Sequence, residues 1–241
     1  MPKSRTIMLI LFFCTSFACS FLSLGKETAP APNLETSQTS EKVISYQNGV
    51  EVEVLPNGIL TIIDRQGNYG LALPNHWEAG AVSMEFAPFV AVATNTNPSI
   101  GHIFESLINK ENTARIFAFD TSPEHLNKDV FSILTVSMSQ DKSCTNLSVI
   151  EIGNAAVKNE LEENPNTEVT VTKEGESKYQ VPWYWYETSI KPPDVQAAYA
   201  GFIVANTGET CIKINYATNN SAIKIEDELS LTIDNLVSIT K

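Results

Sequence analysis

Residues 50–63 have the pattern of a β-hairpin. Valine alternates with glutamate over Val50–Val54, the chain then passes through Pro56-Asn57-Gly58, and an apolar run follows from Ile59. Alternation gives a strand with one buried and one solvent-facing side, and Asn-Gly supplies turn residues that tolerate positive φ. The globular part of the chain is therefore expected to begin with antiparallel strands.

Further alternating or apolar runs predict more strands, and apolar residues at helical spacing predict helices. The expected strands are 69–73, 114–119, 131–138, 168–173, 178–188, 197–206 and 210–217, with a turn at Glu174-Gly175. The expected helices are 97–109, 146–163 and 225–238, and the second should turn Leu147, Ile150, Val157 and Leu161 inward. Pro88 argues against one continuous strand in the apolar segment 81–94.

Hairpins interrupted by helices predict an α+β fold. Residues Ala198–Val204 are apolar at nearly every position, so both faces of their sheet should be covered. The expected architecture is an α/β/α sandwich with a central, mostly antiparallel sheet and helices on both faces.

The segment Tyr69–Trp77, a strand ending in Pro-x-x-Trp, resembles the entry to the PsbP-like fold. The order of elements over about residues 60–240 is similar as well, apart from the apolar segment and helix at 80–112, which look like an insertion. The PsbP-like family includes exported lipoproteins of the DcrB and LpqN types. The resemblance implies an α/β/α sandwich around an antiparallel sheet. It implies no catalytic residues, because the family shares a scaffold and no active site.

Residues 1–25 have the organisation of an export signal. Lys3 and Arg5 precede the apolar run Ile7–Phe13, and no acidic residue occurs before Glu27. The segment is therefore expected to direct the chain out of the cytoplasm.

The fate of this signal is open among three alternatives. Ser16–Cys19 resembles a lipobox, which predicts cleavage before Cys19 and lipidation of that cysteine. Cleavage after Gly25 would fit the small-x-small rule, and an uncleaved segment 7–24 would serve as a membrane anchor. The expected location is the cell membrane, as an anchored lipoprotein, or the extracytoplasmic or periplasmic space.

The rest of the chain divides into a linker and one domain. Residues 26–42 are rich in Pro, Ser, Thr and Glu and are expected to form a flexible polar linker. Residues 43–241 are expected to form a single globular PsbP-like domain. Cys144 and Cys211 suggest one disulfide in an exported domain, with two separate thiols as the alternative.

The charge balance limits the partners. Against 28 acidic residues there are 16 basic ones, a net charge of −12. Phosphate binding needs a basic surface, so nucleic acid is excluded as a partner, and docking on anionic lipid through a basic face is disfavoured.

No local motif predicts catalysis or a bound cofactor. His76, His102 and His125 are far from one another and from cysteine, so no metal site is expected, and His76 is interpreted as a surface or packing residue. The acidic clusters at 160–163 and 226–228 are interpreted as solvated helix faces. The protein is therefore expected not to be an enzyme.

The segment Pro182–Tyr186 offers a binding site. In a strand, Trp183 and Trp185 lie on one face, and Tyr184 and Tyr186 on the other. These rings are either core residues or an exposed aromatic platform, and Pro182 favours an edge strand or a bulge.

The leading hypothesis is a non-enzymatic, membrane-tethered envelope protein that acts as a binding or assembly module for another envelope component. Its expected partners are the membrane, through a lipid or N-terminal anchor, and an envelope protein. The alternative is an exported small-ligand or glycan-binding protein that uses the same aromatic strand, residues 183–186.

Overall fold

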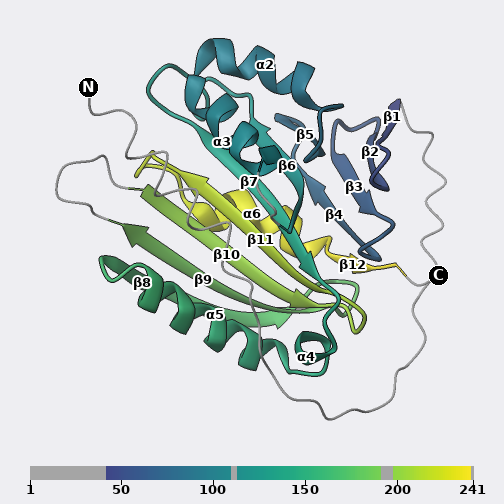
Figure 1. The fold of residues 1–241 in the computed structure, drawn as a ribbon, viewed down its shortest axis with the longest axis vertical. Coiled ribbons are helices and arrows are strands. Elements are labelled where there is room, and N and C mark those ends of the chain that lie inside the picture. The colour runs from purple at the N-terminus through teal and green to yellow at the C-terminus, as the bar shows by residue number, and fades with distance from the viewer. Residues whose placement is uncertain (1–41, 110–112, 191–197, 240–241) are drawn as a thin grey trace.

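The computed structural model describes residues 42–109, 113–190 and 198–239 (Figure 1). Its strands form two antiparallel sheets. The smaller sheet has the order β1-β2-β3-β4-β12. It consists of β1 (Lys42–Ser45), β2 (Val50–Val54), β3 (Leu60–Asp64), β4 (Tyr69–Leu73) and β12 (Val237–Ser238).

The larger sheet has seven strands in the order β5-β6-β7-β11-β10-β9-β8. It consists of β5 (Trp77–Ala81), β6 (Ala114–Asp120), β7 (Ser132–Ser139), β8 (Thr167–Glu176), β9 (Pro182–Ile190), β10 (Ala198–Asn206) and β11 (Cys211–Thr218). Every pair in it is antiparallel.

Helices cover both faces of the larger sheet. They are α2 (Ala87–Thr96), α3 (Pro98–Asn109), α4 (Lys142–Thr145), α5 (Val149–Glu163) and α6 (Ile225–Asp234). Helix α5 lies against β9, where a Cβ at Gly153 would fall 2.2 Å from the ring of Tyr184. Helix α6 lies on the opposite face, where a Cβ at Gly201 would fall 2.3 Å from Ile225. The predicted α/β/α arrangement is therefore confirmed (Figure 1).

Several sequence predictions match the structure closely. The predicted hairpin pairs β2 with β3, and the strand at 69–73 is β4. The helix predicted at 97–109 is α3, and the segment containing Pro88 is the helix α2. Proline is tolerated there because the first turn of a helix has no partner for its missing N–H.

Several predicted element boundaries are wrong, and two of them have a clear structural reason. Strand β8 continues through Gly175 to Glu176, and the turn follows it, where Ser177 Oγ accepts hydrogen bonds from the backbone N–H groups of Tyr179 and Val181. The last helix ends at Asp234, because residues 237–238 leave it to pair with β4.

The two sheets are joined by a buried ion pair. Asp64 at the end of β3 is fully buried and contacts the Arg115 guanidinium from β6 with both oxygens, one of them 2.9 Å from Nη2. Arg115 Nη2 also donates to the carbonyl of Asn48 at 2.6 Å, and Asp64 Oδ1 accepts the N–H groups of Gln66 and Gly67, each at 3.0 Å. Asp64 thus fixes both the turn after β3 and the contact between the sheets.

Helix α5 is rotated from its predicted orientation. Ile150 and Leu161, expected to face inward, are each 42% exposed, whereas Glu160, expected on a solvated face, is buried. The close contact between Gly153 and Tyr184 sets this rotation, because the helix approaches the sheet along the side that has no side chain.

Burial raises the pKa of Glu160 to about 7, while Lys213 and a 2.8 Å hydrogen bond from Asn164 oppose the change. A carboxyl whose pKa is higher in the folded protein favours the protonated state. The stabilising contribution of protonated Glu160 to the free energy of unfolding is therefore present at low pH, and it is lost as the pH rises from about 4.5 to about 7. The loss amounts to about 3 kcal/mol at full ionisation.

We expect Glu160→Gln to raise the free energy of unfolding at pH 8 relative to the wild type, and to leave it nearly unchanged at pH 4. Denaturant unfolding across this pH range would measure the difference. The matched control is Glu162→Gln on the exposed side of the same helix, where Lys158 lies 3.8 Å away, and it should show no such trend. A parallel pH dependence for Glu160→Gln and wild type would contradict the expectation.

Candidate metal centre

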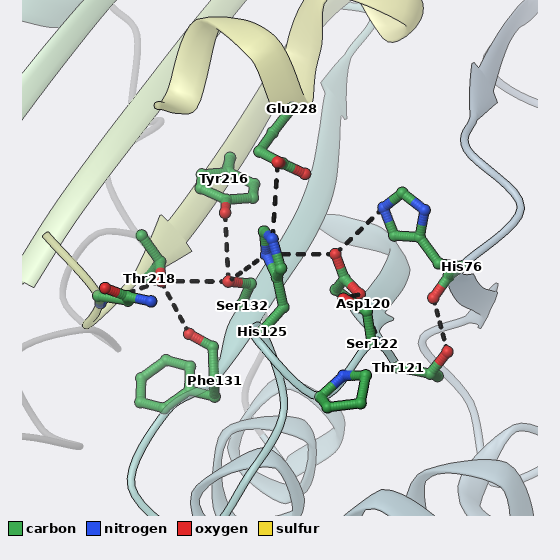
Figure 2. Close-up of polar contacts among 12 residues, drawn as sticks. His76, Asp120, Thr121, Ser122, His125, Phe131, Ser132, Tyr216, Thr218 and Glu228 are labelled. Carbon is green, nitrogen blue, oxygen red and sulfur yellow. Dashed lines mark hydrogen bonds and ion pairs between the residues drawn. The ribbon is translucent and has the colours of Figure 1, made fainter. Parts of the chain in front are cut away.

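A cluster of histidine and carboxylate side chains lies at one end of the larger sheet (Figure 2). His76 precedes β5, Asp120 is the last residue of β6, and Glu228 is on α6. Pairing of β5 with β6 sets Trp77 opposite Asp120, which brings His76 alongside that carboxylate. One potential ligand atom from each of His76, Asp120 and Glu228 lies within 4.8 Å of the other two.

The fully buried Asp120 is at the centre of the cluster. Its Oδ1 accepts hydrogen bonds from the Ser122 backbone N–H at 2.8 Å and from the Ser122 hydroxyl at 2.6 Å. Its Oδ2 lies 3.3 Å from His76 Nε2 and 3.2 Å from His125 Nδ1, yet makes no well-aligned hydrogen bond within the described part of the chain. A buried carboxylate oxygen in this position is stabilised by a nearby cation.

His125 links Asp120 to Glu228. Its Nδ1 is also 3.2 Å from Ser132 Oγ, and its Nε2 is 3.7 Å from Glu228 Oε1. Burial raises the pKa of Glu228, His125 opposes that effect, and the negative charge of Asp120 adds to it. The imidazole therefore lies between two carboxyl groups, with Nδ1 facing Asp120 and Nε2 facing Glu228.

The polar groups behind His125 form a hydrogen-bonded chain. Tyr216 OH donates to Ser132 Oγ at 3.2 Å, Ser132 donates to Thr218 Oγ1 at 3.1 Å, and Thr218 donates to the carbonyl of Phe131 at 3.0 Å. Ser132, His125 and Glu228 have the composition of a hydrolase triad. Ser132 is completely buried, however, so it cannot attack a substrate and instead orients the imidazole.

His76 forms the open side of the cluster. Its backbone carbonyl accepts hydrogen bonds from the Thr121 N–H at 2.8 Å and the Thr121 hydroxyl at 2.7 Å, which hold the residue in place. Its side chain is 38% exposed, whereas that of Asp120 has no exposure. A ligand would therefore enter from the His76 side and meet Asp120 at the bottom.

The donor atoms suit a divalent transition metal. Imidazole nitrogen and carboxylate oxygen are ordinary ligands of Zn²⁺, at about 2.0–2.2 Å from the ion. Two such ligands in a tetrahedral arrangement are about 3.3 Å apart, and His76 Nε2 and Asp120 Oδ2 are separated by 3.3 Å. Glu228 would complete three protein ligands, with a fourth position on the exposed side.

The absence of a metal site stays a prediction, but the sequence analysis did not foresee that these three potential ligands lie together. They come from positions 76, 120 and 228, so no short spacing motif connects them. Glu228 was assigned to a solvated helix face, and His76 to the surface. The available signal was the strand pairing itself, since Trp77 opposite Asp120 places both side chains at one sheet end.

The predicted aromatic binding site is wrong for three of its four residues. Tyr184, Trp185 and Tyr186 are 8%, 2% and 0% exposed, and only Trp183 is partly exposed. Strand β9 is an inner strand between β8 and β10, and Pro182 is its first residue, where a missing N–H is tolerated. These rings therefore pack the core and present no platform to a ligand.

The predicted disulfide is present. Cys144 from α4 and Cys211 at the start of β11 are bonded, with Cα atoms 6.2 Å apart. The predicted lipidation site Cys19, the signal at 1–25 and the linker at 26–42 lie outside the described residues, apart from Lys42, which begins β1. No helix in the described ranges is both long and apolar enough to cross a membrane.

Comparison with known proteins gives similarity of structure only. No protein-family model matches the chain, and no curated protein matches it. The chain is similar to the solution structure of cyanobacterial PsbP from Synechocystis sp. PCC 6803, with 12% identity and a TM-score of 0.47, over 76% of this chain and 93% of that one. That protein is of the PsbP type to which the sequence resemblance points, and the resemblance stays a prediction for this chain.

A second similar structure is a protein of Bacteroides thetaiotaomicron VPI-5482. Its identity to this chain is 13% and the TM-score is 0.40, over 75% of this chain and 48% of the other. Neither similarity indicates what this chain does, because proteins that share a fold differ in function.

Proposed function

We propose that the protein is a non-enzymatic, membrane-tethered module of the cell envelope that binds a divalent metal ion, with Zn²⁺ as the best fit, through His76, Asp120 and Glu228. The observation that supports this most directly is Asp120 Oδ2, which is buried and lacks an aligned hydrogen bond, yet faces an imidazole nitrogen at 3.3 Å. A metal ion at that point would compensate the buried charge.

The disulfide favours a location outside the cytoplasm. Disulfides persist in oxidising compartments, and Cys144–Cys211 is buried in the domain that follows the signal-like N-terminus. The lipid or N-terminal anchor of the proposal rests on residues 1–25 alone.

A binding role fits the cluster better than catalysis. Ser132, the hydroxyl beside His125, is buried and already hydrogen-bonded, and it supports the imidazole. The fourth ligand position would open toward His76, where a side chain of another envelope component could complete the coordination. The metal ion would then act as the connection to a partner.

The alternative role, binding of a small ligand or glycan, is not supported, because most of the aromatic surface it requires is buried. It required exposed rings on residues 183–186, and Trp185 and Tyr186 are in the core. We therefore base the proposal on the metal cluster alone.

We expect the purified full-length chain in detergent to bind one Zn²⁺ in isothermal titration, and His76→Ala to weaken that binding by about 100-fold or more. Loss of a ligand should exceed the 10- to 100-fold effect of disturbing a group behind one. The His76 side chain is 38% exposed and contacts only Asp120 and His125 among the cluster residues, so its truncation should leave the far-UV circular dichroism unchanged.

The matched control is His102→Ala. His102 is on α3, is 59% exposed, and its nearest charged neighbour is Glu105 at 4.0 Å, so its loss should leave Zn²⁺ affinity unchanged. Equal weakening by both substitutions, or the absence of saturable binding to the wild type, would refute the proposed metal centre.

A further inference from the structure

Helix α2 and the turn before it present apolar side chains to the outside of the molecule. This α2 face consists of Met84 in the turn and of Pro88, Ala91 and Val92 on the helix, all exposed, and the exposed polar residues beside them are Glu85, Asn95 and Thr96. Met84 and Val92 are each 71% exposed. From Phe86 to Gly101 the chain contains no charged residue and no histidine, although the whole protein has a net charge of −12. Contiguous exposed apolar surface on a soluble fold marks an interaction site.

Two polar side chains of this region, Thr94 on α2 and Asn97 after it, are hydrogen-bonded within the protein, whereas Asn95 and Thr96 at the C-terminal end of the helix are exposed. Thr94 Oγ1 donates to the carbonyl of Val90 at 2.8 Å, and Asn97 after the helix donates to the carbonyls of Asn127 and Val130 at 3.0 and 3.1 Å. These side chains are satisfied by the protein. The helix can therefore enter an apolar environment without leaving those groups unpaired.

The α2 face lies where the N-terminal part of the chain enters the domain. The N–H of Gln47, just after β1, donates to Glu85 Oε2 at 3.1 Å, and the rings of Tyr46 and Phe86 contact edge to face at 6.2 Å. Among large apolar side chains exposed in the described ranges, Val43, Met84 and Val92 lie in this region, while Ile150 and Leu161 are on α5 at the opposite end (Figure 1).

The chain that precedes β1 indicates what covers this face. It contains the apolar run 7–24, and residues 26–42 can extend over about 60 Å at most. A domain held at that distance experiences a high local concentration of membrane surface, so a weak contact suffices.

The size and charge of the face favour a bilayer over a protein. A stable protein interface uses about 20–30 residues a side, whereas the α2 face offers only a few exposed apolar residues on one helix and the turn before it. Helix α2 itself carries no charged residue, which matches neutral lipid, and the single acidic residue Glu85 before it offers little to an oppositely charged partner.

We infer that the α2 face of this domain rests on the lipid bilayer that holds the N-terminal anchor, with Met84 and Val92 inserted among the lipids. This inference uses the membrane tether of the proposed function and is independent of the metal centre. The inserted side chains add affinity that is insensitive to salt, because no ion pair is involved.

The test uses the full-length chain in phosphatidylcholine vesicles, with one fluorescent amino acid introduced genetically at position 92 or, as a control, at the exposed position 161 on α5 at the opposite end of the domain. We expect nitroxide groups on the lipid acyl chains to quench the probe at position 92 at least several-fold more than at 161, with no effect of salt. Iodide in the water should quench in the opposite order.

Three other outcomes would each overturn the inference, and each would have a different explanation. Equal lipid quenching at the two positions means that the domain does not orient toward the bilayer. Protection of position 92 from iodide without lipid quenching indicates a protein contact, such as a second copy of the chain. A chain absent from the vesicle fraction refutes the membrane tether as well.

A final comparison tests the side chains themselves. Val92→Asp places a charge on the exposed face of α2 and should lower lipid quenching at a probe placed at position 84 to the level seen at 161. Unchanged quenching in this variant would contradict insertion of Val92.

Discussion

Breaking the ion pair between Asp64 and Arg115 should cost about 3–5 kcal/mol of unfolding free energy, because each single substitution leaves the other charge buried without its partner. Asp64→Asn removes the counter-charge of Arg115 and keeps the side-chain shape. Arg115→Met leaves the fully buried carboxylate of Asp64 uncompensated. Urea unfolding at pH 7 would measure both losses.

The chain contains a matched control for this prediction. Arg65 and Glu51 form the same two-bond geometry, with Nε to Oε1 at 2.8 Å and Nη2 to Oε2 at 2.7 Å, but Arg65 is 60% exposed. Glu51→Gln should cost no more than about 1 kcal/mol. If Asp64→Asn and Glu51→Gln had similar small effects, Asp64 would not be the connection between the sheets that its burial indicates.

The two charges of the buried pair should also be non-additive. In a double variant that replaces Asp64 and Arg115 with apolar residues, neither charge remains buried, so the total loss should be smaller than the sum of the single losses. Additive losses would show that the two residues stabilise the fold independently.

The parts of this fold that the sequence predicts are those encoded locally. The hairpin of β2 and β3 follows from the alternation over Val50–Val54 and the Asn57-Gly58 turn, and α3 follows from its apolar spacing. Both signals are complete within about 15 residues, so no distant segment is needed to interpret them.

The orientation of α5 could not be predicted from local sequence patterns. By composition, Ile150 and Leu161 belong inside and Glu160 outside, and the structure has the reverse. The orientation of the helix is set by the contact of Gly153 with Tyr184 on strand β9. This contact lets the helix backbone approach the sheet closely along one side only. The sequence does not state this pairing.

The meeting of His76, Asp120 and Glu228 could not be predicted from the sequence for the same reason. His76 and Asp120 meet because β5 pairs with β6, and Glu228 joins them because α6 docks where Gly201 leaves room for Ile225.

For the aromatic strand β9, the local signal favours the wrong position in the sheet. Pro182 favours an edge strand, although the strand that it begins lies between two others.

The second large effect should come from the disulfide. Replacing both Cys144 and Cys211 with serine should lower the free energy of unfolding by about 4 kcal/mol, the chain-entropy cost of freeing a 67-residue loop in the unfolded state. The folded region has other support, since the Asn206 side-chain amide donates to the carbonyls of Thr145 and Leu147 at 3.1 and 3.0 Å. The native structure should therefore persist, with unchanged far-UV circular dichroism.

The denaturant dependence distinguishes an effect on the unfolded chain from a local loss of packing. Without the cross-link the unfolded chain is more expanded, so the slope of unfolding free energy against urea should increase as stability falls. Asn206→Ala, which loosens the same corner of the fold but keeps the disulfide, should lower stability by about 1–3 kcal/mol and leave that slope unchanged. A loss below about 1 kcal/mol in the double serine variant, at constant slope, would show that the loop between Cys144 and Cys211 is constrained by other contacts. An equal loss in both variants at constant slope would mean that the disulfide acts through packing in the folded state.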